Sequence, residues 1–146
     1  MPLATPAAVR QQLKSGRVDP IYLLQGEDDV EKSALAGEFA ALVDEGLRAF
    51  NVERIHAGDL TTADKLADGV ASIVGAVRTL PMMSPQRVVI VLQADTLLVP
   101  KRESEAATRA LDQLETIINQ ADPRTTLVLV AGSVDKRSRM YKLLVK

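Results

Sequence analysis

The run Val88-Val89-Ile90-Val91-Leu92 decides the fold class of this chain more than any other stretch. A continuous apolar run of this kind predicts a strand that is covered on both faces. Upstream, apolar residues recur at the spacing of one helix face: Leu66, Val70, Ile73, Val74 and Val77. A core-facing helix that leads into a doubly covered strand is typical of a parallel sheet packed between helices.

The same alternation of helix and strand continues along the rest of the chain. The predicted strands are residues 21–24, 50–55, 88–92 and 125–130, of which 50–55 rests on the alternation of apolar and polar residues that begins at Phe50. The predicted helices begin near residues 5–6, 28–29, 61–62, 101–104 and 137. The long fourth helix has a clear core face, which consists of Ala107, Ala110, Leu111, Leu114, Ile117 and Ile118. This order predicts a three-layer α/β domain with a parallel sheet and helices on both faces.

Length and composition narrow the class of protein further. A chain of 146 residues corresponds to one domain with a real core. The 18 basic and 19 acidic residues nearly cancel, so a contact with DNA would need a local basic cluster. The lack of cysteine and the single histidine, His56, argue against a metal or catalytic site built on these residues. No signal peptide or apolar run of ~20 residues is present, which predicts a soluble, cytoplasmic protein with no membrane partner.

The last helix predicts that the chain continues. Its apolar face, begun by Met140, Leu143 and Leu144, reaches Lys146 without a glycine or another C-cap. Residues 1–146 are therefore expected to be one domain of a longer, multidomain protein.

The loop after the first strand resembles a phosphate-binding loop in part. Such a loop needs a glycine, four residues and then Gly-Lys-Ser or Gly-Lys-Thr, and Gly26, Lys32 and Ser33 match this pattern. Glu31 replaces the second glycine, and the arc that would wrap phosphates is acidic: Glu27, Asp28 and Asp29. Carboxylates there repel phosphate and cap the helix themselves. The preferred prediction is a degenerate site without a nucleotide cofactor, and the alternative is a divergent P-loop NTPase that uses Lys32 and Ser33.

Two other polar features carry weaker predictions. Asp95 follows the central strand too late for a magnesium ligand and is expected to order the next turn. The one dense basic cluster includes Lys136, Arg137 and Arg139 at the start of the last helix. It predicts either a contact with DNA phosphates, as in a DNA-binding α/β domain, or an ordinary solvated helix face. No catalytic arrangement is legible from the spacing of serine, histidine and acidic residues.

Four adjacent apolar residues lie on the connection before the central strand, where polar residues would be expected: Leu80, Pro81, Met82 and Met83. Proline ends the preceding helix, and the run belongs to neither the helix nor the strand period. Apolar side chains on a connection indicate a docking point for another protein, for which methionine is well suited. The alternative is that one or two of them fold back as a lid over the core.

Five strings together resemble the delta subunit of bacterial DNA polymerase III, over nearly all of the chain. In order they are residues 21–28, 50–53, 78–82, 87–91 and 129–137. The resemblance implies the N-terminal domain of that subunit, with an AAA+ fold that has lost nucleotide binding and no catalytic residues. It also implies a role in the clamp loader: this subunit grips the sliding clamp (the beta subunit) and opens its ring. ATP-binding clamp-loader subunits are the implied partners, and primed DNA only within the assembly.

The resemblance also implies which residues grip the clamp. In the family an apolar pair stands at the helix end before the central strand, which by position corresponds to Pro81 and Met82, with Leu80 and Met83 beside them. Family members often place a Leu-Phe pair there, so the Pro-Met pair is a chemical departure at the expected contact.

Overall fold

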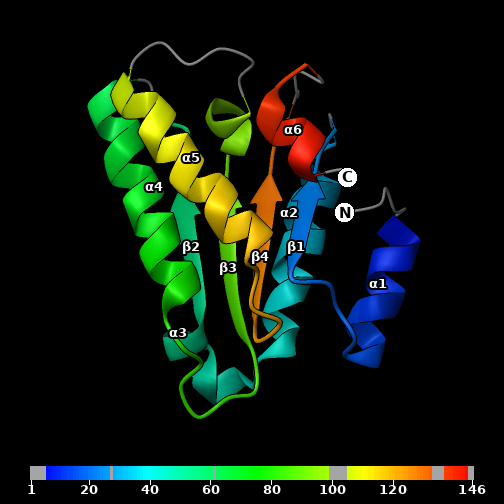
Figure 1. Cartoon of the computed structure of the whole chain (residues 1–146). Helices are drawn as coiled ribbons and strands as arrows, with labels where there is room; N and C mark the ends of the chain where they lie inside the picture. Colours follow the sequence, from blue (N-terminus) through cyan, green and yellow to red (C-terminus); the bar gives the residue numbers. More distant parts are fainter. Residues whose placement is uncertain (1–5, 27, 61, 99–104, 133–136, 145–146) are drawn as a thin grey trace.

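Four parallel strands form one sheet at the centre of the molecule (Figure 1). The computed structural model describes residues 6–26, 28–60, 62–98, 105–132 and 137–144, with Ala63 and Arg139 described by their backbone only. Every neighbouring pair in the sheet is parallel, which confirms the predicted fold class. The strands in spatial order are β1 (Ile21–Leu24), β4 (Thr125–Val130), β3 (Arg87–Leu92) and β2 (Val52–His56).

Helices cover both faces of this sheet, so the domain has the three predicted layers (Figure 1). One face carries α4 (Ala63–Arg78), α5 (Glu105–Asn119) and α6 (Arg139–Leu144). The other carries α1 (Pro6–Ser15) and α2 (Asp29–Glu38). A short helix, α3 (Arg48–Asn51), leads directly into β2. Within the described residues, none of the helices is both long and apolar enough to cross a membrane.

The central strand explains why the domain has two cores. Side chains alternate across a strand, so Val88 and Ile90 pack on the α2 side while Val89 and Val91 pack on the α4 side. All four are at most 1% exposed. On the α2 side, the ring of Phe39 packs edge-on against Tyr22, with 4.8 Å between the centroids. The continuous apolar run at 88–92 is thus the signature of a strand between two helical layers.

The predicted helix starts agree with the observed caps where the structure describes them. The Asp28 carboxylate accepts a hydrogen bond from the Glu31 N–H at 3.0 Å and caps α2. The Thr62 hydroxyl accepts one from the Lys65 N–H at 3.2 Å and caps α4. The last helix begins at Arg139, two residues after the predicted start. The predicted start of the long helix, at residues 101–104, lies outside the described residues.

The predicted strand at 50–55 was wrong at its beginning. Strand β2 starts at Val52, whereas Phe50 and Asn51 belong to α3. The Asn51 side chain is fully buried and hydrogen-bonds the Leu47 carbonyl within the same turn, and Phe50 is 61% exposed. The alternation of apolar and polar residues did not reflect a half-buried strand here, because the tertiary contacts of Asn51 favour a helical turn.

Candidate functional site

The apolar connection between α4 and β3 is exposed. Leu80, Met82 and Met83 are 63%, 55% and 85% exposed, and Pro81 is half-buried. Only two other large apolar side chains among the described residues are comparably exposed, Val30 and Phe50. The exposure of these three side chains favours the docking interpretation over a lid made by one or two of the four residues. In Figure 1 this connection runs along the lower end of the molecule.

The backbone of this segment is held in place by Asn51. The Asn51 Nδ2 group donates to the Met82 carbonyl at 2.8 Å, and the Met82 N–H donates to Asn51 Oδ1 at 2.6 Å. The amide therefore satisfies both backbone groups of Met82, as a neighbouring strand would. Met83 then adopts a φ of 58°, in the left-handed region that non-glycine residues seldom occupy. The segment is consequently ordered at its backbone while its side chains point into solvent.

Arg87 fixes the elements around the segment. Its guanidinium donates to the Ala76 carbonyl in the last turn of α4, at 2.9 Å, and to the Phe50 carbonyl in α3, at 2.9 Å. It also pairs with the Glu53 carboxylate on β2 at 2.8 Å. The residue is only 5% exposed. One buried side chain thus joins the end of α4, the start of β3 and the entry to β2.

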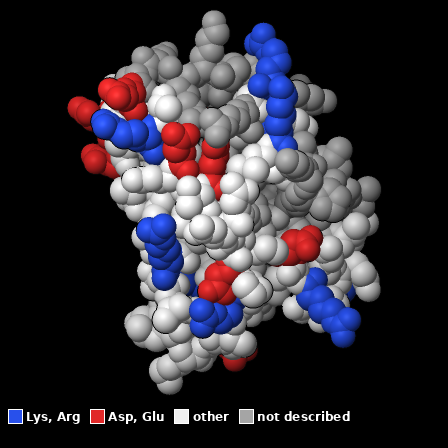
Figure 2. All heavy atoms as spheres, in the orientation of Figure 1, with Lys and Arg blue, Asp and Glu red and all other residues white. Residues whose placement is uncertain are grey.

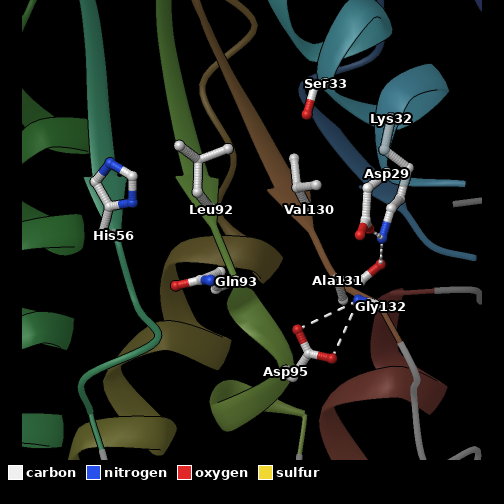
Figure 3. Close-up of a pocket in the computed structure, with 10 residues that line it drawn as sticks. All are labelled: Asp29, Lys32, Ser33, His56, Leu92, Gln93, Asp95, Val130, Ala131 and Gly132. Atoms are coloured by element: carbon white, nitrogen blue, oxygen red, sulfur yellow. Dashed lines mark hydrogen bonds and ion pairs between the residues drawn. The ribbon is translucent and has the colours of Figure 1, made fainter. Parts of the chain in front are cut away.

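The phosphate-binding-like loop lies at the opposite end of the sheet, at the carboxyl ends of the strands (Figures 1 and 3). Lys32 is 9% exposed, and its Nζ donates to the Ala131 carbonyl at 2.9 Å and pairs with Asp29 Oδ1 at 3.1 Å. Figure 3 shows these contacts crossing from α2 to the end of β4. The lysine that would bind a phosphate is therefore engaged by the protein itself.

The acidic residues of the loop are also engaged. Asp28 caps α2, and Glu31 forms an ion pair with Arg10 of α1 at 2.7 Å. Glu27 lies outside the described residues. Ser33 is exposed and makes no contact that would replace a phosphate or a metal. Because carboxylates sit at the helix N-terminus where an anion would bind, this geometry favours the degenerate site over a nucleotide site.

Asp95 joins the turn after β3 to the turn after β4. It lies in a short 3-10 helix after β3, at Ala94–Leu97, and its carboxylate accepts from the Gly132 N–H at 3.0 and 3.2 Å. Figure 3 shows this contact spanning the ends of β3 and β4. The prediction that Asp95 orders the next turn was therefore incomplete, because its side chain joins two loops that are distant in sequence.

A cavity of about 410 Å³ remains at this end of the sheet. It is lined by Asp29, Lys32, Ser33, His56, Leu92, Gln93, Asp95, Val130, Ala131 and Gly132 (Figure 3). Its volume is within the range of small-molecule sites, about 300–1,000 Å³. Within the described residues, no group of three or more histidine or acidic side chains is placed to hold a metal ion. The cavity lies beside the phosphate-binding-like loop, whose Lys32 is engaged by Ala131 and Asp29.

We predict that ATP with Mg²⁺ at 1 mM leaves the melting temperature of this chain unchanged in a thermal-shift assay. A ligand at a hundred times its Kd stabilises a protein by about 2.7 kcal/mol, so even modest binding would be visible. The variant Glu31→Gly is expected to behave in the same way, because Asp28 and Asp29 remain. A thermal shift that is lost in Ser33→Ala or Lys32→Ala would contradict this prediction and support the NTPase alternative. Ser33→Ala is the cleaner control, since Ser33 is exposed whereas Lys32 is buried.

The basic cluster is described only in part. Lys136 lies outside the described residues, as does the side chain of Arg139, and Arg137 is exposed and has a contact of its own. On the face drawn in Figure 2, the described basic and acidic side chains are interspersed. A DNA contact through Lys136, Arg137 and Arg139 remains a prediction.

Sequence reasoning missed the two residues that organise the apolar segment, Asn51 and Arg87. Each carried a weak signal. An asparagine interrupts the predicted strand at 50–55, and an arginine stands at the first position of a strand that is otherwise wholly apolar. A polar residue beside a buried run indicates a hydrogen-bonded role, because buried polar groups are nearly always paired. The partners themselves could not be read from the sequence.

Comparison with known proteins places these features in a family. The profile of the family described as "DNA polymerase III, delta subunit" matches residues 22–146. The DNA clamp loader delta protein of Bacillus subtilis is similar in structure, with a TM-score of 0.75 and 25% identity over 97% of this chain and 40% of that one. A DNA polymerase III gamma subunit-related protein of Thermotoga maritima shares the fold, with a TM-score of 0.60 and 16% identity over 85% of this chain and 39% of that one.

The curated protein sequences include no match to the chain. The chain spans about 40% of the length of the Bacillus subtilis protein. The family profile nevertheless covers most of its residues, and the five strings that suggested the resemblance lie almost wholly within the matched range. The chain therefore belongs to the DNA polymerase III delta subunit family.

Proposed function

We propose that this chain is the sliding-clamp-binding domain of a clamp loader, and that it helps to open the clamp ring during DNA replication without hydrolysing nucleotide. The observation that carries the proposal is the exposed apolar segment 80–83, whose backbone is ordered by Asn51. Membership of the delta subunit family supports the same role. An exposed apolar segment whose backbone is already ordered loses little conformational entropy on binding. More of the free energy gained by burying its side chains therefore contributes to affinity.

The proposed mechanism is mechanical. Leu80, Met82 and Met83 insert into an apolar pocket on the clamp, and each fully buried side chain contributes about 1.5–3 kcal/mol. A domain that binds the open conformation of the ring more tightly than the closed one shifts the ring toward opening, by no more than that difference in affinity. Arg87 links α4, α3 and β2 beside the segment, and these links would transmit a force from the segment to the sheet.

The energy for the cycle comes, in this proposal, from partner subunits that bind ATP. Lys32 is engaged by Ala131 and Asp29, which supports a non-catalytic role for this domain. Its other partners are then the remaining clamp-loader subunits, with primed DNA contacted only within the assembly. We therefore propose a cytoplasmic location for this domain, together with the DNA on which the clamp loader acts.

The direct test is to titrate this chain into a purified sliding clamp and to measure heat by calorimetry at two temperatures. We expect a complex with a negative heat-capacity change, because the proposed contact buries mainly apolar surface. Affinity should change little between 50 and 200 mM salt, whereas a contact with DNA phosphates would weaken steeply over this range. A chain that does not bind the clamp, but binds duplex DNA with strong salt dependence, would contradict the proposal and support the DNA-binding alternative.

A further inference from the structure

The aromatic residues of this chain have very unequal exposure. The chain has two phenylalanines, two tyrosines and no tryptophan. Tyr22, Phe39 and Tyr141 are 4%, 0% and 8% exposed, whereas Phe50 is 61% exposed. A single exposed aromatic is ordinary by itself. Phe50, however, lies close to the exposed apolar segment 80–83, so the two can contact the same partner.

Phe50 is linked to the start of β3 through its own carbonyl, and to the segment 80–83 through its neighbour Asn51. Its carbonyl accepts from Arg87 Nη1 at 2.9 Å, and its neighbour Asn51 holds both backbone groups of Met82. Since consecutive Cα atoms are about 3.8 Å apart, these bonds keep the Phe50 and Met82 backbones within roughly 12 Å of each other. The exposed ring and the exposed segment therefore belong to one end of the domain, below the sheet in Figure 1.

We infer that Phe50 is a second anchor of the docking surface, which binds the same clamp as Leu80, Met82 and Met83. This inference rests on the proposed function. Binding energy at protein interfaces is concentrated in a few anchors, among which aromatic residues are enriched. The two-part surface then consists of an apolar segment and an aromatic side chain, and Asn51 sets the distance between them.

The position of the surface in the fold is consistent with a clamp as occupant. Phe50 precedes β2 and the segment precedes β3, so both lie at the amino ends of parallel strands. The phosphate-binding-like loop lies at the carboxyl ends. A partner as large as a protein ring could therefore dock on this end without covering the opposite one. Continuity with the segment makes the clamp, rather than a second copy of the chain, the occupant of the surface.

The test compares Phe50→Ala with Val30→Ala in clamp binding. Val30 is 82% exposed on α2, at the other end of the sheet, and is thus a matched apolar control. We expect Phe50→Ala to weaken clamp binding about tenfold or more and Val30→Ala to leave it unchanged. Phe50→Trp, which keeps an apolar aromatic surface, should retain most of the affinity. Melting temperatures of all three variants should stay close to that of the wild type, since both positions are exposed.

A photo-crosslinking phenylalanine analogue at position 50 gives an independent readout that does not depend on affinity. It should crosslink to the clamp, whereas the same analogue at position 30 should not. Normal affinity of Phe50→Ala together with no crosslink at position 50, while Met82→Ser weakens binding, would overturn the inference and leave the proposed function intact. A wild-type chain that does not bind the clamp at all would refute both.

Discussion

Replacing Leu80, Met82 and Met83 together by serine is expected to weaken binding to the sliding clamp at least a hundredfold, with a melting temperature within about 2 °C of the wild type. A hundredfold loss corresponds to about 2.7 kcal/mol, which is less than the burial of two such side chains would supply. Stability should be spared because the three side chains are mostly exposed, and because Pro81 and the Asn51 contacts to the Met82 backbone are kept.

Clamp titration by calorimetry and a thermal melt on the same samples check this result. Val30→Ser is the control for the loss of exposed apolar surface elsewhere, and it should bind the clamp normally. Single replacements should be graded, with Met82→Ser the most costly, because the family resemblance predicts that Met82 is one of the clamp-gripping apolar pair. Unchanged clamp binding in the triple variant would remove the segment from the interface. A large fall in melting temperature would instead mean that the segment supports the core.

The substitution Arg87→Met is expected to lower the free energy of unfolding by about 3 kcal/mol, the largest stability loss that we predict at a polar residue. Methionine has a similar length but leaves the Phe50 carbonyl without its Arg87 donor and the Ala76 carbonyl with only the longer bond from the Thr79 N–H, at 3.3 Å. Each buried acceptor left unsatisfied costs about 1–3 kcal/mol, whereas Glu53 is partly exposed and can be hydrated. For a domain of this size, the melting temperature should fall by about 6–12 °C.

Arg54→Met on neighbouring β2 is the matched control, because Arg54 is exposed on the same small region of the sheet. It should change stability by no more than about 0.5 kcal/mol. Arg87→Lys should recover little of the loss, since an ammonium group cannot reach three acceptors in the fork geometry of a guanidinium. Equal losses in Arg87→Met and Arg54→Met, measured by denaturant unfolding, would show that the hydrogen bonds of Arg87 are not the stabilising contact.

The two ends of the sheet carry different features. The carboxyl end has a cavity at which Lys32 and Asp95 bind the protein's own backbone, at Ala131 and Gly132. The amino end presents an apolar segment on buried polar supports. Internal contacts thus engage the polar side chains at one end, and at the other end they hold the backbone of an exposed apolar segment.

Local patterns in the sequence determined the fold class. The doubly covered strand at 88–92, the apolar face of α5 and the caps at Asp28 and Thr62 all follow from periodicity or from the hydrogen-bonding needs of a helix start. Each of these signals extends over a few residues, so it does not depend on how the rest of the chain folds. For the same reason, the sequence alone was enough to identify two further features. These are the acidic residues that replace the phosphate-binding pattern and the apolar connection at 80–83.

Only the tertiary structure decided what supports these features. Asn51 and Met82 are 31 positions apart, and Lys32 and Ala131 are 99 apart. Polar partners at such separations depend on which strands become neighbours and in which register, and periodicity carries no information about that choice. For the same reason, alternation assigned Phe50 and Asn51 to a strand that they do not join. Asn51 is buried where it contacts Met82 on the connection before β3, whereas Phe50 is exposed. The sequence by itself determined the layers of this protein and its family resemblance, whereas long-range hydrogen bonds decided the shape of its surfaces.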